Sequence, residues 1–346
     1  MDQPLISMII PAHNVAPFLP RCVDSILCQK SVSLELILVD DSSTDETGAI
    51  CEAYAARDPR VRVLHRSYRD LSQTRNAGME IARGEYIGFS DGDDVVSPRL
   101  LQAVGEVLSR QRPEMIRYGF RMVFADGTGE DWVLPYPQGP AAPEELGRQR
   151  LDGICTEHVL DYTFPKVQTA WSHMFSRELI RRAGLRFRPA REILSEDYLF
   201  VLQALYAARS IYHLAAPYYD YIEHHGSLSR SLKPRMMERK KNLIQAYMAF
   251  LPMEDPEVTV RLRNFYIDSV YDCFYNAATE CSSLREAMER IRPLLRDAHL
   301  VECIRKNRDR IVSRKSRCIC FLMARRMGLT MYVLHRLLHR RKKRGT

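Results

Sequence analysis

The chain has 346 residues, enough for one large domain or two smaller ones. Apolar residues make up 46% and charged residues 27%, which is typical of a folded protein and excludes disordered and collagen-like chains. No run of about 18 uncharged apolar residues is present, so we predict no membrane-spanning helix. The first 30 residues show no basic-then-apolar pattern, so we expect no signal peptide.

The cysteine content and the distribution of charge indicate the cellular compartment and the kind of partner. The nine cysteines are an odd set without a CxxC pair, which argues against a disulfide framework and a cysteine zinc site and favours reduced thiols in the cytosol. The net charge of +8 is uneven, because residues 301–346 carry 15 Lys and Arg against only Glu302 and Asp309. This basic tail predicts an anionic partner, either a membrane surface or nucleic acid.

Apolar runs alternate with helical patterns in the first 110 residues. The predicted strands are residues 5–10, 34–39, 61–65 and 85–89. The predicted helices are residues 15–29, 44–57 and 71–82, with a further helix opening at Ser97. Strands separated by such helices indicate right-handed βαβ units, so the predicted fold class is α/β with a mostly parallel sheet flanked by helices.

The rest of the chain changes character along its length. Residues 114–137 are predicted to be β structure with a turn at Asp126, and residues 165–230 alternate short strands and helices. A helical C-terminal region follows. Its predicted helices are residues 235–251, 256–280, 283–297 and 299–341. The expected domains are therefore 1–230 and 231–346, the first divided into halves at about residue 110.

Polar segments follow three of the predicted strands, at 11–14, 40–45 and 91–94. In parallel sheets, ligands bind beyond the carboxyl ends of the strands. In the last segment, Asp91, Asp93 and Asp94 repel one another unless a cation lies between them, and Gly92 lets the backbone direct two of them at one object. Mg²⁺ carrying a diphosphate is the natural occupant. The alternative is an exposed acidic turn before the next helix.

Two other positions have the right chemistry for a nucleotide. A carboxylate in the pair Asp40 and Asp41 can accept hydrogen bonds from a base or a ribose, although the neighbouring Ser43 and Thr44 also suit a helix N-cap. Arg75, always charged, can face a phosphate. Taken alone, the segment around Arg75 is better explained as a helix start.

Residues 4–100 resemble family 2 glycosyltransferases of the GT-A fold. The matching segments are PLIS with IIP and Asn14, LVDDSSTD at 38–45, Ser72 with RNAG at 75–78, ARGEYIGF at 82–89 and DGDD at 91–94. The resemblance implies that Asp41 accepts from the base, usually uracil, and that Pro11, His13 and Asn14 line the base pocket. It also implies that Asp91 and Gly92 approach the ribose and that Asp93 holds Mn²⁺ or Mg²⁺.

This sequence departs from the family pattern at two places. His13 stands where tyrosine is common, and Arg69 and Asp70 replace a usual pair of glycines. Further along, WSHMF at 171–175 resembles the Trp-Asn-Lys-Leu-Phe element of a bacterial branch, with His173 in place of lysine.

SEDYLF at 195–200 resembles the Glu-Asp motif of the same branch, so Asp197, with Glu196 beside it, is the expected general base on a helix capped by Ser195. The alternative is two acids favoured by the helix dipole. A further ligand of the metal is expected in the segment 218–229. His224 and His225 are the candidates, and we predict His225. The alternative is an ordinary surface histidine.

The basic tail interleaves apolar residues with arginine and lysine over residues 314–344. A single helical stripe is predicted, formed by Leu322, Met323, Met327, Met331, Leu334, Leu337 and Leu338. Such a helix suits the surface of an anionic membrane. The alternative is a helix that packs this stripe on the body of the protein. Nucleic acid is not expected as a partner, since no binding motif is present.

The predicted function is an inverting, metal-dependent hexosyl- or N-acetylhexosaminyltransferase. The resemblance implies a UDP-sugar donor and a hydroxyl acceptor on a surface glycan or lipid-linked chain, in capsule or lipopolysaccharide assembly at the cytoplasmic face of a bacterial membrane. The alternatives are a nucleotidyltransferase of related fold, a non-catalytic sugar-nucleotide-binding or membrane-scaffold protein, and a nucleic-acid-binding protein.

Overall fold

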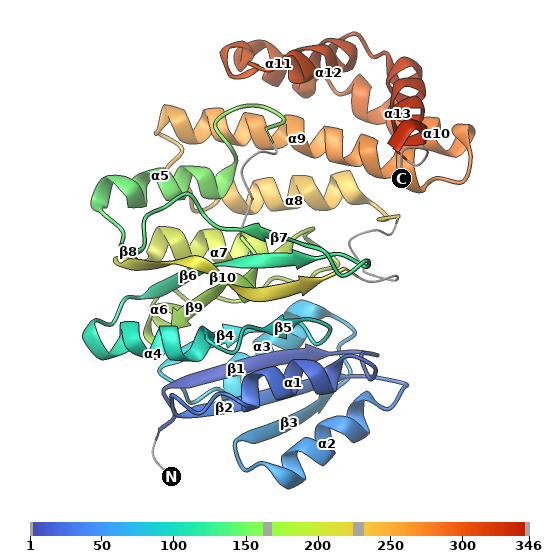
Figure 1. The fold of residues 1–346 in the computed structure, drawn as a ribbon. Coiled ribbons are helices and arrows are strands. Elements are labelled where there is room, and N and C mark those ends of the chain that lie inside the picture. The colour runs from blue at the N-terminus through green and yellow to red at the C-terminus, as the bar shows by residue number, and fades with distance from the viewer. Residues whose placement is uncertain (1–2, 162–167, 224–231, 343–346) are drawn as a thin grey trace. The chain divides into compact units, whose positions relative to one another are not determined.

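A computed structural model describes residues 3–161, 168–223 and 232–342 (Figure 1). The chain divides into two compact units. The first comprises Met1–Arg150 and Val167–His225, and the second comprises Leu151–Lys166 and Gly226–Thr346. The segment 151–166 thus belongs with the C-terminal helices and not with the sheet that surrounds it in the sequence.

The first unit is built on a sheet that contains ten strands within the described residues (Figure 1). The order is β3-β2-β1-β4-β9-β6-β10-β5, with β7 paired to β6 and β8 paired to β10. The strands are β1 (Ile6–Ala12), β2 (Leu34–Asp41), β3 (Val61–Arg66), β4 (Tyr86–Phe89), β5 (Val95–Val96), β6 (Met115–Val123), β7 (Gly129–Trp132), β8 (Gly139–Pro140), β9 (His173–Ser176) and β10 (Ile211–Ile222).

The strand directions confirm the predicted fold class. Strands β1, β2, β3 and β4 are parallel, as are β6 and β10, whereas β9 runs antiparallel to both of its neighbours. The four strands predicted in the first 110 residues are all present. Strand β5 escaped prediction because two residues carry no periodicity of their own; it forms only by pairing with β10.

Helices of the first unit cover the sheet. They are α1 (Leu19–Leu27), α2 (Thr47–Arg57), α3 (Leu71–Ile81), α4 (Leu100–Arg110), α6 (Arg177–Arg182) and α7 (Glu196–Ala207), with α5 (Pro143–Ile154) reaching the unit boundary. One core cluster joins strand residues such as Ile9, Val39 and Phe89 to buried residues of α3, α6 and α7. Within it the rings of Phe187 and Phe200 stack at 4.0 Å. This packing sets α3 and α7 against the sheet.

Two predicted helix starts were wrong by three residues. Helix α2 begins at Thr47 and not at 44, because the side chain of Asp45 accepts a hydrogen bond from the Thr47 N–H. Helix α4 begins at Leu100 and not at Ser97, because the backbone of Ser97 is bonded to Tyr218 of β10. Both starts were moved by local or long-range hydrogen bonds.

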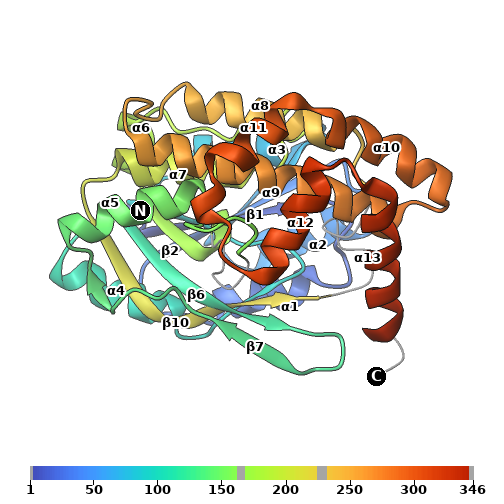
Figure 2. The ribbon, with the colours of Figure 1, turned by 90° about the horizontal axis from the view of Figure 1, so that it is seen from above.

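The second unit is helical. Its helices are α8 (Met236–Met248), α9 (Pro256–Glu280), α10 (Leu284–Arg296), α11 (Ala298–Lys306), α12 (Arg314–Ala324) and α13 (Gly328–Lys342). The single helix predicted over 299–341 was wrong. Asn307, buried and hydrogen-bonded to α9, ends α11; Ser313 caps α12; and Arg326 turns the chain in the left-handed region (φ 57°) before α13. Helix α13 packs against α9, α10 and α12 (Figure 2).

The contact between α3 and β1 can be tested at Gly78, whose Cβ would lie 2.4 Å from Ile9 Cγ2. Because Ile9 is fully buried, Gly78→Ala should lower the free energy of unfolding by about 1–2 kcal/mol despite the better helix propensity of alanine. Gly147 of α5 is the matched control, since a Cβ there meets no described atom within 4 Å. Gly147→Ala should be neutral or stabilising in denaturant titrations. Equal effects of the two substitutions would contradict this packing.

Candidate functional site

The loops after β1 and β2 are tied to each other at the carboxyl edge of the sheet. Asn14, in the left-handed region (φ 52°), accepts a hydrogen bond from the Thr44 N–H at 2.8 Å, and its own N–H donates to the Ser43 hydroxyl at 3.1 Å. His13 Nδ1 lies 2.7 Å from the carbonyl oxygen of Asp41. Pro11 is buried at the end of β1. The four residues expected at the base pocket therefore come together, and their contact with a base stays a prediction.

Asp41 organises the following loop. Its carboxylate accepts hydrogen bonds from the N–H groups of Tyr68, Arg69 and Asp70 at 2.6–3.0 Å, and from the Thr74 hydroxyl at 2.9 Å. Burial by itself would raise the pKa of Asp41, but the backbone N–H groups of Arg69 and Asp70 lower it below its ordinary value. The bulkier Arg69-Asp70 loop is thus held by the same carboxylate that is predicted to meet the base.

The acidic segment 91–94 forms a turn closed by the Asp94 N–H, which donates to the Asp91 carbonyl at 3.2 Å. Asp94 is 2% exposed and accepts from the Tyr219 hydroxyl at 2.7 Å and the Ile222 N–H at 2.9 Å. Burial, and then the charges of Asp91 and Asp93, raise the pKa of Asp94 well above its usual range. Asp94 therefore holds the turn from inside, while Asp91 and Asp93 are partly exposed.

Arg75 joins this turn to a helix 121 residues further along the chain. It is 2% exposed, and its guanidinium donates to Asp91 Oδ1 at 2.9 Å and to Glu196 Oε1 at 3.0 Å. Its Nε has no hydrogen-bond partner among the described residues. The guanidinium thus lies between two carboxylates, and the expected contact with a phosphate stays a prediction. Burial raises the pKa of Asp91 above its ordinary value. The Arg75 charge opposes this effect, and the Asp93 charge adds to it.

Helix α7 begins with the two acids predicted for catalysis. Ser195 occupies the N-cap position with φ 64°, but its side chain makes no capping hydrogen bond in the described structure, so the expected serine cap was wrong. Burial and the neighbouring Glu196 charge raise the pKa of Asp197 to about 7, against the opposing effect of Arg75. A carboxyl group that gives and takes its proton near neutral pH has the property that a general base needs.

The carboxylates of this region suit a hard cation that is also coordinated by the phosphate oxygens of a ligand. The carboxyl groups of Asp91, Asp93, Glu196 and Asp197 lie near one another; Arg75 pairs with Asp91 and Glu196, and Arg21 donates to the carbonyl oxygen of Asp93 at 3.3 Å. Among the described residues, no three His, Cys, Asp or Glu side chains group closely enough to hold a metal ion by themselves. Mg²⁺ and Mn²⁺ accept few carboxylates plus phosphate oxygens, which suits Asp93. The further ligand predicted at His225 lies outside the described residues.

His173, which stands in place of a lysine, is an internal residue. It is fully buried, and its ring lies between Thr169 O, 2.9 Å from Nδ1, and Arg117 Nε, 3.2 Å from Nε2. Burial and the Arg117 charge lower the pKa of His173 well below its ordinary value. The residue is therefore neutral and serves the packing of β9.

Sequence reasoning missed Tyr219. This fully buried residue of β10 contacts the acidic turn, and its ring stacks on Trp171 at 4.4 Å. The segment around it was noted only for its histidines. The available signal was the group of three tyrosines at 218, 219 and 221 beside the acidic Asp220.

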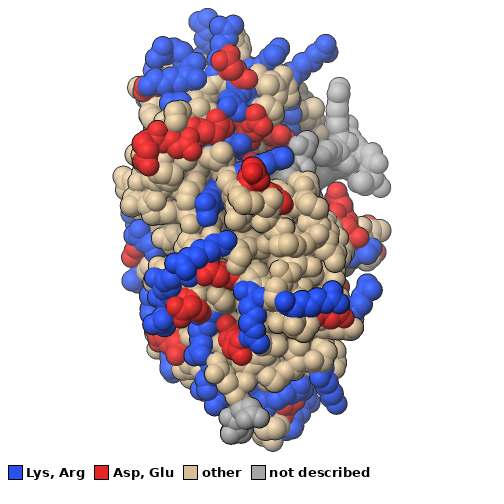
Figure 3. All heavy atoms as spheres, turned by 90° about the vertical axis from the view of Figure 1, so that its left-hand side faces the viewer, with Lys and Arg blue, Asp and Glu red and all other residues tan. Residues whose placement is uncertain are grey.

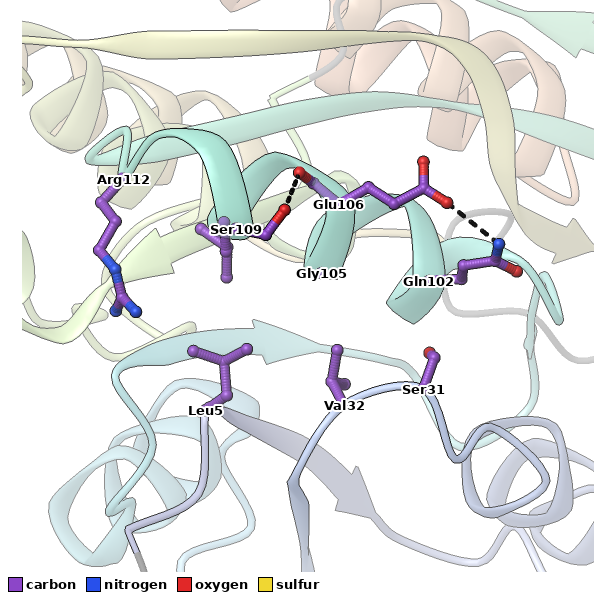
Figure 4. A pocket seen from close by; sticks show the side chains of 9 residues that line it. Leu5, Ser31, Val32, Gln102, Gly105, Glu106, Ser109 and Arg112 are labelled. Carbon is purple, nitrogen blue, oxygen red and sulfur yellow. Dashed lines mark hydrogen bonds between the residues drawn. The ribbon is translucent and has the colours of Figure 1, made fainter.

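A cavity of about 370 Å³ lies at the opposite edge of the sheet, beside Leu5, Val32 and the helix α4 (Figure 4). Glu106 of its lining is bonded to Gln102 of the same helix. Because Leu5 directly precedes β1, this cavity is at the amino ends of the strands. Ligands of parallel sheets bind at the carboxyl ends, so the acidic turn is the better candidate.

Comparisons with known proteins identify the family of the chain. The family model described as glycosyl transferase family 2 matches residues 7–175. The glycosyltransferase EpsJ of Bacillus subtilis, itself described as uncharacterized, is 35% identical over 254 residues, which cover 71% of this chain and 70% of EpsJ. The putative glycosyltransferase EpsH of the same organism is 26% identical over 343 residues, 94% of this chain and 93% of EpsH.

A solved structure has the same fold. Residues 1–349 of TarS from S. aureus, in complex with UDP-GlcNAc, match with a TM-score of 0.69 and 17% identity, over 97% of this chain and 91% of that one. The sheet order and these similarities lead to one conclusion: the chain belongs to glycosyl transferase family 2, with a sheet of the GT-A type.

Proposed function

We propose that this glycosyltransferase moves a hexose or N-acetylhexosamine from a UDP-sugar to a hydroxyl of a surface-glycan or lipid-linked acceptor, with inversion and with a divalent metal. The observation that carries the proposal is the Arg75 bridge, which ties Asp91 to Glu196 and so brings the acidic turn beside the start of α7. The structures of TarS with UDP-GlcNAc and with UDP support a uridine nucleotide as donor.

In the donor half, different strand ends bind different parts of the nucleotide sugar. The loops after β1 and β2, with Pro11, His13, Asn14 and Asp41, bind the nucleotide base. Asp91 and Gly92 approach the ribose; a Cβ at Gly92 would lie 3.1 Å from Val15 Cγ2, so only glycine fits this turn without a shift. Asp93, with His225, would hold Mn²⁺ or Mg²⁺, which neutralises the charge of the departing diphosphate when bound.

The acceptor half of the first unit supplies the general base of the reaction. In a single displacement, the acceptor hydroxyl loses its proton as the donor bond breaks, so a carboxylate that is ionised at working pH must be close by. Asp197 meets this need, because its pKa of about 7 makes it both ionised and basic near neutrality. Burial, and then repulsion by the Glu196 charge, raise the pKa of Asp197 into that range, and Glu196 is itself paired with Arg75.

The donor and the metal are tested together with a panel of nucleotide sugars and Mn²⁺. We expect UDP release from one UDP-sugar, loss of release with EDTA, and a fall of at least about 100-fold in Asp93→Ala, as for removal of a charge-stabilising group. Asp126→Ala, in the exposed β6–β7 turn, is the control and should keep full activity.

Other outcomes of this assay point to the alternatives. Release of pyrophosphate in place of UDP would identify a nucleotidyltransferase. Binding of UDP without any turnover would identify a non-catalytic protein. Full turnover in EDTA would remove the metal from the mechanism.

The role of Asp197 predicts a pH profile. The transfer rate should rise with pH up to about 7 and then level off, and Asp197→Asn should lower kcat by about 10²–10⁴. A carboxyl with a raised pKa in the folded state also binds more protons than in the unfolded state between about pH 4 and 7, so it lowers stability as pH rises through that range. Asp197→Asn should therefore stabilise the protein more at pH 8 than at pH 4, as measured by thermal unfolding. Asp126→Asn should show neither effect.

The C-terminal helices suggest where the enzyme works. The single predicted stripe is divided: Leu322, Met323 and Met331 are buried in the core of the second unit, which fits the alternative of packing on the body. A second set faces outward, with exposed fractions of 44–64%. It comprises Phe321, Leu329, Val333, Leu334, Leu337 and Leu338. None of the described helices is both long and apolar enough to cross a bilayer.

We propose that this outward set lies on the cytoplasmic face of a bacterial membrane. No acidic residue follows Asp309, whereas basic residues recur up to Arg344. On the face drawn in Figure 3, Lys and Arg side chains lie over the C-terminal helices as well as over the first unit. An apolar face bordered by cations suits anionic phospholipid, to which each nearby basic residue adds about 1 kcal/mol of attraction.

Vesicle flotation tests this placement. The protein should float with vesicles that contain phosphatidylglycerol and much less with phosphatidylcholine alone. The triple variant Leu329→Gln, Val333→Gln, Leu337→Gln should lose at least about 10-fold in binding, because three apolar side chains no longer enter the interface. Met248→Gln, which changes another half-exposed apolar residue, should bind as before. Unchanged flotation of the triple variant would contradict the proposal.

A further inference from the structure

The hydroxyl of Tyr219 connects the two ends of the acidic turn. The Asp91 N–H donates to it at 3.0 Å, and the hydroxyl donates to Asp94 Oδ2 at 2.7 Å. The Asp94 N–H donates to the Asp91 carbonyl oxygen at 3.2 Å, and this bond closes a ring of hydrogen bonds. Tyr219 itself is fully buried in β10, 128 residues from Asp91.

The direction of these bonds has one solution. A backbone N–H can only donate, so the hydroxyl oxygen accepts from Asp91, and its one proton must go to Asp94. The other carboxylate oxygen of Asp94 accepts from the Ile222 N–H at 2.9 Å, which holds the carboxylate on β10. The peptide plane at Asp91 is therefore oriented by a strand from the other half of the sheet.

The ring of Tyr219 has little freedom to move. It stacks on Trp171 at 4.4 Å with 11° between the planes, and its backbone pairs with Val96 of β5. The hydroxyl is therefore held in one place and fixes the position of the turn. The side chains of Asp91 and Asp93 remain partly exposed.

We propose that Tyr219 is a positioning residue: its hydroxyl sets the orientation of the 91–94 turn so that Asp91 faces the ribose and Asp93 faces a metal-bound diphosphate, while Tyr219 itself does not touch the substrate. The consequence for the metal depends on the function proposed above, whereas the consequence for the turn depends on geometry alone.

The test compares Tyr219→Phe with Tyr221→Phe. Both variants keep a ring against Trp171, and the hydroxyl of Tyr221 makes no hydrogen bond within the described part of the chain. Three quantities are measured: deuterium exchange of peptides covering 88–96, calorimetric affinity for UDP with Mn²⁺ and with EDTA, and the steady-state constants for donor and acceptor.

In Tyr219→Phe we expect faster exchange at 91–94, at least about 10-fold weaker UDP binding with Mn²⁺ but unchanged binding with EDTA, and a kcat lower by about 10-fold or more with the acceptor KM unchanged. Tyr221→Phe should match the wild-type protein in all three. A Tyr219→Phe protein that only melts at a lower temperature, with normal exchange at 91–94 and normal Mn²⁺-dependent binding, would show a purely structural role and overturn the proposal.

The two proposals fail in different ways. If the wild-type protein itself binds no UDP with Mn²⁺, the proposed function falls, and the exchange at 91–94 still decides whether Tyr219 orients the turn. If the wild-type protein binds and turns over as proposed and Tyr219→Phe does the same, the positioning role is wrong.

Discussion

The site depends on one buried cation, Arg75, shared by two carboxylates from distant parts of the chain. A guanidinium can donate to two carboxylates at once in a planar geometry that lysine cannot reproduce. Placing a charge at 2% exposure carries a desolvation cost, which is offset only while both partners stay in place. Removing one partner of such a group typically costs about 3–5 kcal/mol, so the start of α7 and the acidic turn are coupled in stability as well as in position.

The same arrangement explains the proton affinities of the acids. Burial, and then the charges of neighbouring carboxyl groups, raise the pKa values of Asp91, Asp94 and Asp197, and the pairing with Arg75 offsets this only in part for Asp91 and Asp197. Asp41 shows the opposite behaviour, because four donors solvate its carboxylate. Carboxylates this close to one another are the kind of group that the divalent cation proposed above would neutralise.

The second unit shows a related division between packing and exposure. Helix α13 buries Met331 against the unit core and turns Val333 and Leu337 outward. A helix that is apolar on both faces needs a partner on each of them. The core supplies one partner, and the anionic membrane surface proposed above would be the other, in keeping with the basic composition after Asp309.

Much of the first unit follows from local pattern. Apolar runs of strand length and the helices between them were enough to predict β1–β4, and the acids directly after Val39 and Ser90 marked the carboxyl ends of two of these strands. These features are local because burial on both faces of a parallel strand leaves a continuous apolar run, and because polar residues can resume only where the strand ends.

Only the tertiary structure decided which partners those residues meet. The pairing of Arg75 with Glu196, the contact of Tyr219 with Asp91, and the existence of β5 each join segments far apart in sequence, for which periodicity carries no information. The tail was decided in the same way: one stripe was predicted, but breaks near Asn307 and Arg326 let part of it pack inward and turned the rest outward. Sequence patterns specify which face of an element is apolar, whereas the packing of the whole chain determines what that face contacts.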